Sequence, residues 1–218
     1  MSSFWEKRPY VWMRQALNVD EVSKLQGAGQ LDGAAGRRLG AEGVINGAIA
    51  PVTRAINLQF GGYQPVRVVS FAKTDDANWQ VPWHQDRVIA VQEKADIDGF
   101  GNWSKKSDQW HCEPPVQILE DMLFVRVFLD PCNAETGGME FSVGSHVAGL
   151  IPFGDAVEMS EAYLNEIEEA EAGDILVLPM LTLHRSRPAE TVNNRRVLRI
   201  DYARDALPEP LHWIDYVS

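Results

Sequence analysis

A His-x-Asp triplet, a distant histidine and an arginine shortly after it are the residues of this chain best suited to chemistry. His84 and Asp86 flank Gln85, and His184 lies far downstream, within Leu-Thr-Leu-His-Arg-Ser. Two imidazoles and one carboxylate on one face of an octahedral metal leave three positions open, the arrangement that non-haem Fe(II) oxygenases use. The guanidinium of Arg195 could then bind a carboxylate of a chelating organic acid. The pattern predicts iron chemistry with dioxygen and a 2-oxo acid.

The sequence around each candidate ligand gives it a predicted position. Residues 87–91 are strand-like, and alternation along a strand would point His84 and Asp86 to the same side of a barrel mouth. The alternative is a hydrogen-bonded His–Asp pair on the surface. His184 follows the strand-like residues 173–179 in an apolar segment, where a lone histidine is often a satisfied core residue.

Two arginines lie on one face of the last strand-like segment. Alternation places Arg195, Val197 and Arg199 together. An arginine that faces the inside of a barrel needs an anion, which a dicarboxylate cosubstrate would supply. The alternative partner is an Asp or Glu at the barrel rim. Periodicity alone does not choose between Arg195 and Arg199.

The wider pattern predicts a mainly β domain with flanking helices. Helices are expected at residues 19–25, capped by Asn18 or Asp20, and at residues 41–60, bent or interrupted at Pro51. Six segments are β-rich: 66–71, 87–92, 122–129, 139–143, 174–178 and 196–202. We expect one domain over residues 1–218, with residues 1–60 as helical support and residues 66–203 as an antiparallel barrel or sandwich.

Two insertions interrupt the strand pattern. Residues 93–115 are rich in Gly, Trp and charge, and a loop of this length is typical of a lid over a site or of disorder. The aromatic residues near the metal motif suggest a small, partly apolar substrate under such a lid; they are Trp79, Trp83, Phe100, Trp103 and Trp110. Core packing is an equal alternative for Trp79. Residues 160–170 resemble a short acidic helix.

Composition narrows the class of protein and of partner. The chain has 218 residues, of which 45% are hydrophobic and 23% charged, as in ordinary globular proteins. A net charge of −11 argues against a nucleic-acid partner, because phosphate binding depends on clustered Lys and Arg. No secretory signal or membrane-spanning run is evident, so we expect no membrane association. Cys112 and Cys132 are expected to be free thiols of a cytoplasmic protein, which acts as a monomer or homodimer.

Several ordered motifs together resemble the phytanoyl-CoA dioxygenase family of Fe(II)/2-oxoglutarate oxygenases, over residues 66–202. They are Phe-Ala-Lys-Thr at 71–74, Ala-Asn-Trp-Gln-Val-Pro-Trp-His-Gln-Asp at 77–86, Gly-Gly-Met-Glu-Phe-Ser-Val-Gly-Ser-His at 137–146, Ala-Gly-Asp at 172–174, Leu-His-Arg-Ser at 183–186 and Arg-Arg-Val-Leu at 195–198. The resemblance implies a double-stranded β-helix, a cupin-like jelly roll that holds iron at its open end. It also favours Arg195 over Arg199 for the cosubstrate.

The resemblance also implies roles for individual residues. His84, Asp86 and His184 would bind Fe(II), and Arg195 would bind the distal carboxylate of 2-oxoglutarate with help from Ser186. Lys73 would be a further cosubstrate contact. The Gly-Ser-His sequence at 144–146 is a turn landmark, and His146 is not expected to be a ligand.

Arg126 departs from the family pattern, because some relatives carry a pocket-lining aromatic residue there. It would bind a substrate or cosubstrate carboxylate, or pair with an acid; both alternatives are open. The implied reaction is hydroxylation of a small molecule with release of succinate and CO2. Halogenating relatives lack the carboxylate found at Asp86, so its presence argues for hydroxylation, desaturation or a related oxidation. The competing hypotheses are a cupin-like metal enzyme that does not use 2-oxoglutarate, and a non-catalytic barrel that binds a small ligand.

Overall fold

The elements of the chain are mostly strands, as the computed structural model shows for residues 2–28, 36–41, 43–193 and 195–216. The helices are α1 Ser2–Lys7, α2 Val19–Ala28, α3 Gly43–Gln59, α4 Val116–Glu120 and α5 Ala156–Glu161, with 3-10 turns η1 Ser145–Ala148 and η2 Phe153–Asp155. The strands are β1 Val11–Met13, β2 Arg37–Leu39, β3 Gln64–Ala72, β4 Val81–His84, β5 Ile89–Val91, β6 Gly101–Lys106, β7 Gln109–Glu113, β8 Leu123–Phe128, β9 Met139–Ser142, β10 Asn165–Ile167, β11 Ile175–Pro179, β12 His184–Ser186 and β13 Arg196–Ala203.

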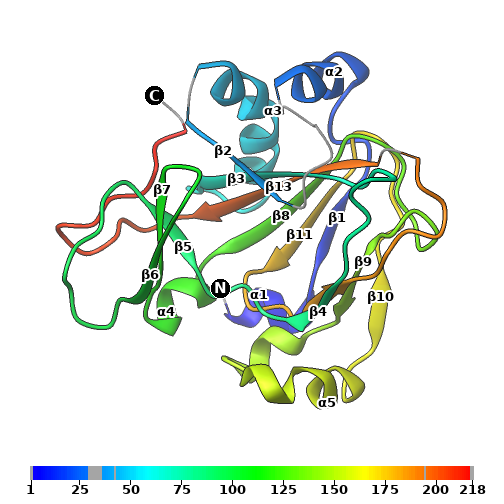
Figure 1. The fold of residues 1–218 in the computed structure, drawn as a ribbon. Helices are drawn as coiled ribbons and strands as arrows, with labels where there is room; N and C mark the ends of the chain where they lie inside the picture. The colour runs from blue at the N-terminus through cyan, green and yellow to red at the C-terminus, as the bar shows by residue number, and fades with distance from the viewer. Residues whose placement is uncertain (1, 29–35, 42, 194, 217–218) are drawn as a thin grey trace.

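Three sheets are described. A large sheet has the strand order β1-β11-β8-β13-β3-β2, a smaller one the order β10-β9-β12-β4, and a third the order β5-β7-β6. Figure 1 shows α2 and α3 lying together along one side of the large sheet, with β4, β9 and β10 beyond its other side. This is the double-stranded β-helix that the resemblance implied, with the first two sheets as its walls.

Alternation along the central strands divides the large sheet into an outer and an inner face. On β13, Leu198, Ile200 and Tyr202 belong to the core beneath α2 and α3, whereas Val197 belongs to the core inside the barrel. Strand β8 divides in the same way, since Val125 lies in the helix-covered core and the two phenylalanines at 124 and 128 lie in the inner one. The charged residues Arg126, Arg199 and Asp201 occupy remaining inner positions of β8 and β13, and the site forms there.

The six predicted strands are all present, and the helix at α2 begins at a capping box. The backbone N–H of Glu21 donates to Asn18 Oδ1, and that of Asn18 donates to Glu21 Oε2, both at 3.0 Å. Helix α3 runs without interruption from Gly43 to Gln59 and contains Pro51, so the expected helix is present but is not interrupted there. The sequence between the two predicted helices, residues 27–40, is a Gly-rich connection and lies partly outside the described residues.

Two predictions about the insertions are wrong. Residues 160–170 are not a helix, because α5 ends at Glu161 and Asn165–Ile167 pairs with β9 instead. Residues 93–115 are not an irregular loop, because they fold into the β6–β7 hairpin, which extends β5. In both places pairing with a distant strand overrides the local signal.

Cys112 and Cys132 are buried free thiols, in line with the sequence. Among the helices described, none has the length and apolar character that crossing a bilayer requires.

Candidate metal centre

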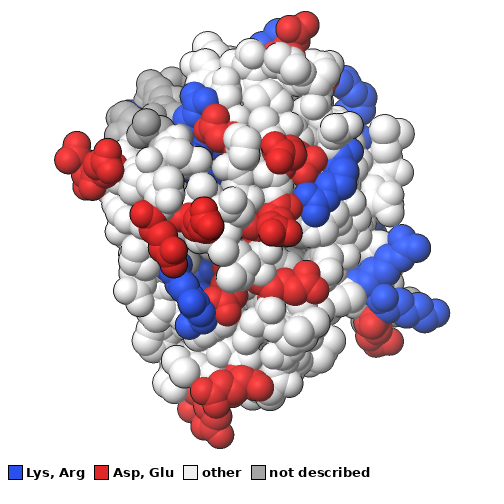
Figure 2. Space-filling view, turned by 90° about the vertical axis from the view of Figure 1, so that its right-hand side faces the viewer, with Lys and Arg blue, Asp and Glu red and all other residues white. Residues whose placement is uncertain are grey.

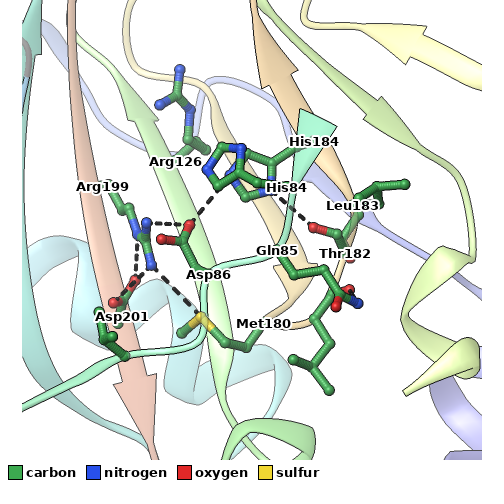
Figure 3. A network of polar contacts seen from close by, with 12 residues as sticks. His84, Gln85, Asp86, Arg126, Met180, Thr182, Leu183, His184, Arg199 and Asp201 are labelled. Carbon is green, nitrogen blue, oxygen red and sulfur yellow. Dashed lines mark hydrogen bonds and ion pairs between the residues drawn. The ribbon is translucent and has the colours of Figure 1, made fainter. Parts of the chain in front are cut away.

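The small sheet brings the two histidines together. His84 ends β4 and His184 begins β12, and the two are direct partners across this antiparallel pair, with ring centroids 4.3 Å apart. The prediction that His84 and Asp86 share one strand is wrong, because β4 ends at His84 and Asp86 lies just beyond it. One ligand atom from each of the three residues nevertheless lies within 4.8 Å of the other two (Figure 3). The side chains converge as a metal site requires.

Backbone carbonyls orient both imidazoles. The Nδ1 atom of His84 lies 2.8 Å from the carbonyl oxygen of Pro82, and Nδ1 of His184 lies 2.8 Å from that of Thr182. When Nδ1–H donates to a carbonyl, Nε2 is left with its lone pair free, and this is how ligating histidines are held in metalloproteins. Burial and the neighbouring His184 lower the pKa of His84 to about 4, so its ring is neutral and able to ligate at neutral pH.

The third ligand candidate, Asp86, is held as a carboxylate. Its Oδ2 atom lies 3.2 Å from His184 Nε2 and also accepts a hydrogen bond from the Arg199 guanidinium. Burial alone would raise the pKa of Asp86, but Arg199 and His184 hold it well below its usual value. The charged form, which a cation needs, is therefore the stable one.

Arg199 is the functional residue that the sequence analysis set aside. It is buried and also donates to Asp201, with Nε 2.7 Å from Oδ1 and Nη2 3.0 Å from Oδ2. Figure 3 shows the guanidinium between the two carboxylates. Because both of its partners are carboxylates, Arg199 positions Asp86 rather than binding a cosubstrate. Strand alternation, which places Arg199 on the inner face, was the sequence signal that could have identified this residue.

Arg195 has a different environment, although it shares that inner face. Only 2% of it is exposed, and it donates to two backbone carbonyls, from Nε to Thr136 at 3.1 Å and from Nη2 to Gly137 at 3.0 Å. Its buried Nη1 has no hydrogen-bond partner among the described residues. The alternative of a rim arginine paired with an acid is not what the structure shows. A buried guanidinium nitrogen without an acceptor fits an anionic ligand.

The histidines, Asp86 and both arginines line one cavity of about 790 Å³, a volume that includes its part open to solvent. Ser186 and Arg126 line it too. Arg126 donates to Glu168 through Nε at 2.7 Å and Nη2 at 3.0 Å, so of the two alternatives considered it takes the acidic partner.

Lys73 is not among the residues that line this cavity. Its ammonium group donates to the carbonyl of Arg187 and lies behind Gly137, where an added Cβ would come within 2.8 Å of it. Burial, together with Arg195 and Arg126, lowers the pKa of Lys73 to about 8. Its role at the cosubstrate stays a prediction.

The aromatic residues near the motif divide into two groups. Trp79 lines the cavity, together with Phe71 and Phe124. Trp83 belongs to a separate small core, and the three aromatic residues of 93–115 pack against the inner core of the barrel. Since no lining residue comes from 93–115, the lid stays a prediction.

Gln85 holds the motif from the side opposite the cavity. Its buried amide donates from Nε2 to the carbonyls of Leu181 at 2.7 Å and Gly149 at 2.8 Å, and Oε1 accepts from the backbone N–H of Ile151 at 2.8 Å. These bonds tie the segment between the ligands to the turn before His184. Sequence reasoning missed this role because a glutamine carries no signal of its partners.

Replacing Gln85 with leucine should therefore destabilise the fold by about 2–4 kcal/mol, because it leaves two carbonyls and an N–H without partners in buried surroundings. Urea unfolding of the metal-free protein measures this loss. Gln92→Leu is the matched control, since exposed Gln92 makes one side-chain bond, to the Trp213 carbonyl. An equal loss in both variants would contradict the stapling role.

Arg199→Met should cost about 3–5 kcal/mol, because partly buried Asp86 and buried Asp201 both lose the guanidinium of Arg199. In the native protein the folded-state pKa of Asp86 is depressed, so the ionised carboxylate stabilises the fold above its unfolded pKa of about 3.9, and this contribution fades as the pH falls through the folded value. Without Arg199, burial raises that pKa, so the metal-free variant should lose stability as pH rises from about 4 to 7.

Urea midpoints across this pH range test whether stability rises with pH in the native protein and falls with pH in Arg199→Met. Arg196→Met serves as control, because Arg196 pairs with partly exposed Asp130 outside the cavity, and its loss should cost below about 1 kcal/mol. Parallel pH profiles of the native protein and Arg199→Met would refute the positioning role of Arg199.

The fold and the convergent ligand set define a metal-binding double-stranded β-helix protein. The chain belongs to the phytanoyl-CoA dioxygenase (PhyH) family, whose sequence profile matches residues 63–197. No functionally curated protein matches the sequence.

Solved structures with the same fold share little sequence with this chain. SnoN, a non-haem α-ketoglutarate-dependent epimerase from nogalamycin biosynthesis, superposes with a TM-score of 0.64 and 14% identity over 94% of this chain and 82% of SnoN. The carbocyclase SnoK of the same biosynthesis gives 0.61 and 15% over 92% and 81%. HygX from Streptomyces hygroscopicus, solved with nickel, 2-oxoglutarate and hygromycin B, gives 0.61 and 14% over 95% and 88%.

Proposed function

We propose that this protein is an Fe(II)- and 2-oxoglutarate-dependent dioxygenase that hydroxylates a small organic substrate and releases succinate and CO2. One observation carries the proposal. The ligand atoms of His84, Asp86 and His184 converge within 4.8 Å, and Arg195 presents to the same cavity a buried nitrogen that has no hydrogen-bond partner among the described residues.

The residues present fit the two groups that this activity needs. Two imidazoles held through Nδ1 and one ionised carboxylate match the donor set for Fe(II), and Arg195 fits the far carboxylate of 2-oxoglutarate, with Ser186 beside it. Bound Fe(II), with 2-oxoglutarate and O2, would supply the oxidation of an otherwise unreactive C–H bond. The chain itself orients the ligands, binds the far end of the cosubstrate, and limits water through the apolar walls at Phe71, Trp79 and Phe124.

The competing hypotheses account for less of the site. A cupin-like enzyme without 2-oxoglutarate would use the three ligands but leave Arg195 Nη1 without an anion. A non-catalytic barrel would have no need for two imidazoles oriented toward one carboxylate. The relatives include an epimerase and a carbocyclase, so the reaction type needs a test of its own.

Anaerobic addition of Fe(II) and then 2-oxoglutarate tests the class. We expect a weak visible charge-transfer band when the 2-oxo acid chelates the iron, and no band with 2-oxoglutarate alone. Correctly folded, iron-loaded protein that shows no band would overturn the proposal. Once a substrate is found, a product heavier by one oxygen atom supports hydroxylation, and an isomer of unchanged mass supports epimerisation.

A further inference from the structure

The cavity that holds the candidate metal site is cationic, although the chain carries a net charge of −11. Figure 2 shows one outer face, with acidic side chains spread over its middle. Inside, six arginines line the cavity: Arg38, Arg67, Arg126, Arg185, Arg195 and Arg199. Such a concentration of positive charge in an acidic protein calls for its own explanation.

Carboxylates balance only part of this charge. Arg126 pairs with Glu168, Arg185 with Glu140, and Arg199 with both Asp86 and Asp201. Four carboxylates thus offset at most four of the six guanidinium charges. Fe(II) and 2-oxoglutarate carry opposite and equal charges, so binding both would leave this positive excess in place. Arg195 accounts for one of the two surplus charges, and the pair Arg38 and Arg67 for the other.

Arg67 is buried, with a relative exposure of 5%. Its Nη1 lies 3.2 Å from the carbonyl of Val88 and 3.4 Å from Asp201 Oδ2, an oxygen that already accepts from Arg199 at 3.0 Å. Its Nε is buried and has no hydrogen-bond partner in the part of the chain that the structure describes. Arg67 therefore shares the carboxylate of Asp201 with Arg199.

Arg38 lies beside Arg67 on the same inner face. Strand β2 pairs with β3 so that Arg38 is opposite Val69, which makes Arg67 its diagonal neighbour. Arg38 Nη1 lies 3.3 Å from the Gly36 carbonyl, and its buried Nε has no partner within the described ranges. Two adjacent guanidiniums thus each present an unused donor.

Among the described residues, the carboxylates that act on this pair are Asp201 and Asp86, and both are already paired with Arg199. Buried His111, from the β6–β7 hairpin, leaves Nε2 without a partner among the residues described. Burial, together with Arg67 and Arg38, lowers the pKa of His111 to about 4, so the ring is neutral at physiological pH. It can exchange a hydrogen bond but offsets no charge.

Arg67 and Arg195 belong to opposite ends of the cavity. Arg67 is paired with Asp201 along β3 and β13, whereas Arg195 lies beside Lys73, six residues further along β3. Strand geometry puts these backbones about 20 Å apart. Arg199, which holds Asp86, pairs with Val69 between them. A five-carbon diacid held at Arg195 would not extend past the metal site to Arg67.

We infer that Arg38 and Arg67 bind the anionic group, a carboxylate or a phosphate, of the substrate to be oxidised. This inference rests on the proposed function and assigns it a substrate class: a small organic anion. The anion enters on the side of the metal site away from Arg195, and its apolar part lies against the aromatic walls of the cavity. Recognition through two guanidinium groups also favours entry of an anion into an otherwise acidic protein.

Calorimetric titration of the apoprotein with inorganic phosphate, and separately with benzoate, tests the pair. In Arg38→Gln/Arg67→Gln the tighter of these probes should bind roughly tenfold to hundredfold more weakly than in the native protein. Arg37→Gln, on the same strand but facing the other way, should bind as the native protein does. Because Arg67 is buried, Arg38→Gln alone provides a second variant if the double one fails to fold.

The two probes separate the chemical classes, and the charge-transfer band separates the proposals. If benzoate binds more tightly, the anionic group of the substrate is a carboxylate. If phosphate binds more tightly, it is a phosphate ester. No binding of either probe, or equal binding in the variants, would overturn the inference. The charge-transfer band should persist in Arg38→Gln/Arg67→Gln, since these residues contact neither the candidate metal ligands nor Arg195. If the native protein shows no band, the oxygenase proposal is refuted, and the measured binding of phosphate or benzoate is judged separately.

Discussion

Replacing His184 with alanine is expected to weaken Fe(II) binding by more than about 100-fold and to abolish turnover. Loss of a residue that only supports a metal ligand costs about 10–100-fold in affinity, so loss of a ligand should cost more. His184 faces both His84 and Asp86, and its Nε2 atom is directed at the shared centre. With two protein donors left instead of three, competing water and chelators remove the metal more readily.

Competition with a chelator measures the affinity, and metal analysis after desalting measures occupancy. Exposed His212 provides the control, because it lies far from the cavity lining and pairs with Glu209. His212→Ala should retain iron and the charge-transfer band. If His184→Ala retains iron as the native protein does, the three residues are not the metal ligands.

Arg195→Met should raise the dissociation constant for 2-oxoglutarate by about 30-fold or more while leaving Fe(II) affinity unchanged. Loss of one partner from a buried, hydrogen-bonded charge pair costs at least about 2 kcal/mol, which corresponds to that factor. The effect should depend on the distal carboxylate. A 2-oxo monoacid lacks that group, so it should bind the native protein and the variant alike.

Arg196→Met is the matched control for this prediction. The two arginines are adjacent in sequence, but Arg196 points to the other face and donates to Asp130 at 2.7 Å. Titration of the charge-transfer band with 2-oxoglutarate gives both dissociation constants. Equal weakening in the two variants would show that general charge, rather than the position of Arg195, governs cosubstrate binding.

The central strands of the large sheet were predictable because their signal is local, whereas the short strands β4, β10 and β12 of the smaller sheet were not among those predicted. Strands β8 and β13 carry apolar residues toward the helices at every second position, and this period of two can be read from the sequence without knowledge of the partners. The helix predicted at residues 160–170 is wrong because the structure of this segment depends on distant partners. Its composition favours a helix, yet Glu166 lies opposite Phe141 on β9 and accepts a hydrogen bond from Tyr10, far away in the sequence.

The residues of the candidate metal site could be selected from residue type, although the local geometry assumed for them was partly wrong. Asp86 reaches the site from beyond the end of β4 rather than from a continuing strand. The Arg199 guanidinium and the amide of Gln85 hold the motif from either side, and neither partner set can be read from neighbouring residues.

By itself, the sequence determined which donors this protein has and which faces of its strands they occupy, because side-chain chemistry and alternation are local properties. Only the tertiary structure decided what each arginine does. Arg195 and Arg199 are equivalent by periodicity, yet Arg199 meets two carboxylates and Arg195 meets carbonyls and an open cavity. The charge left unbalanced depends on partners contributed by distant strands, so it arises only when the barrel closes.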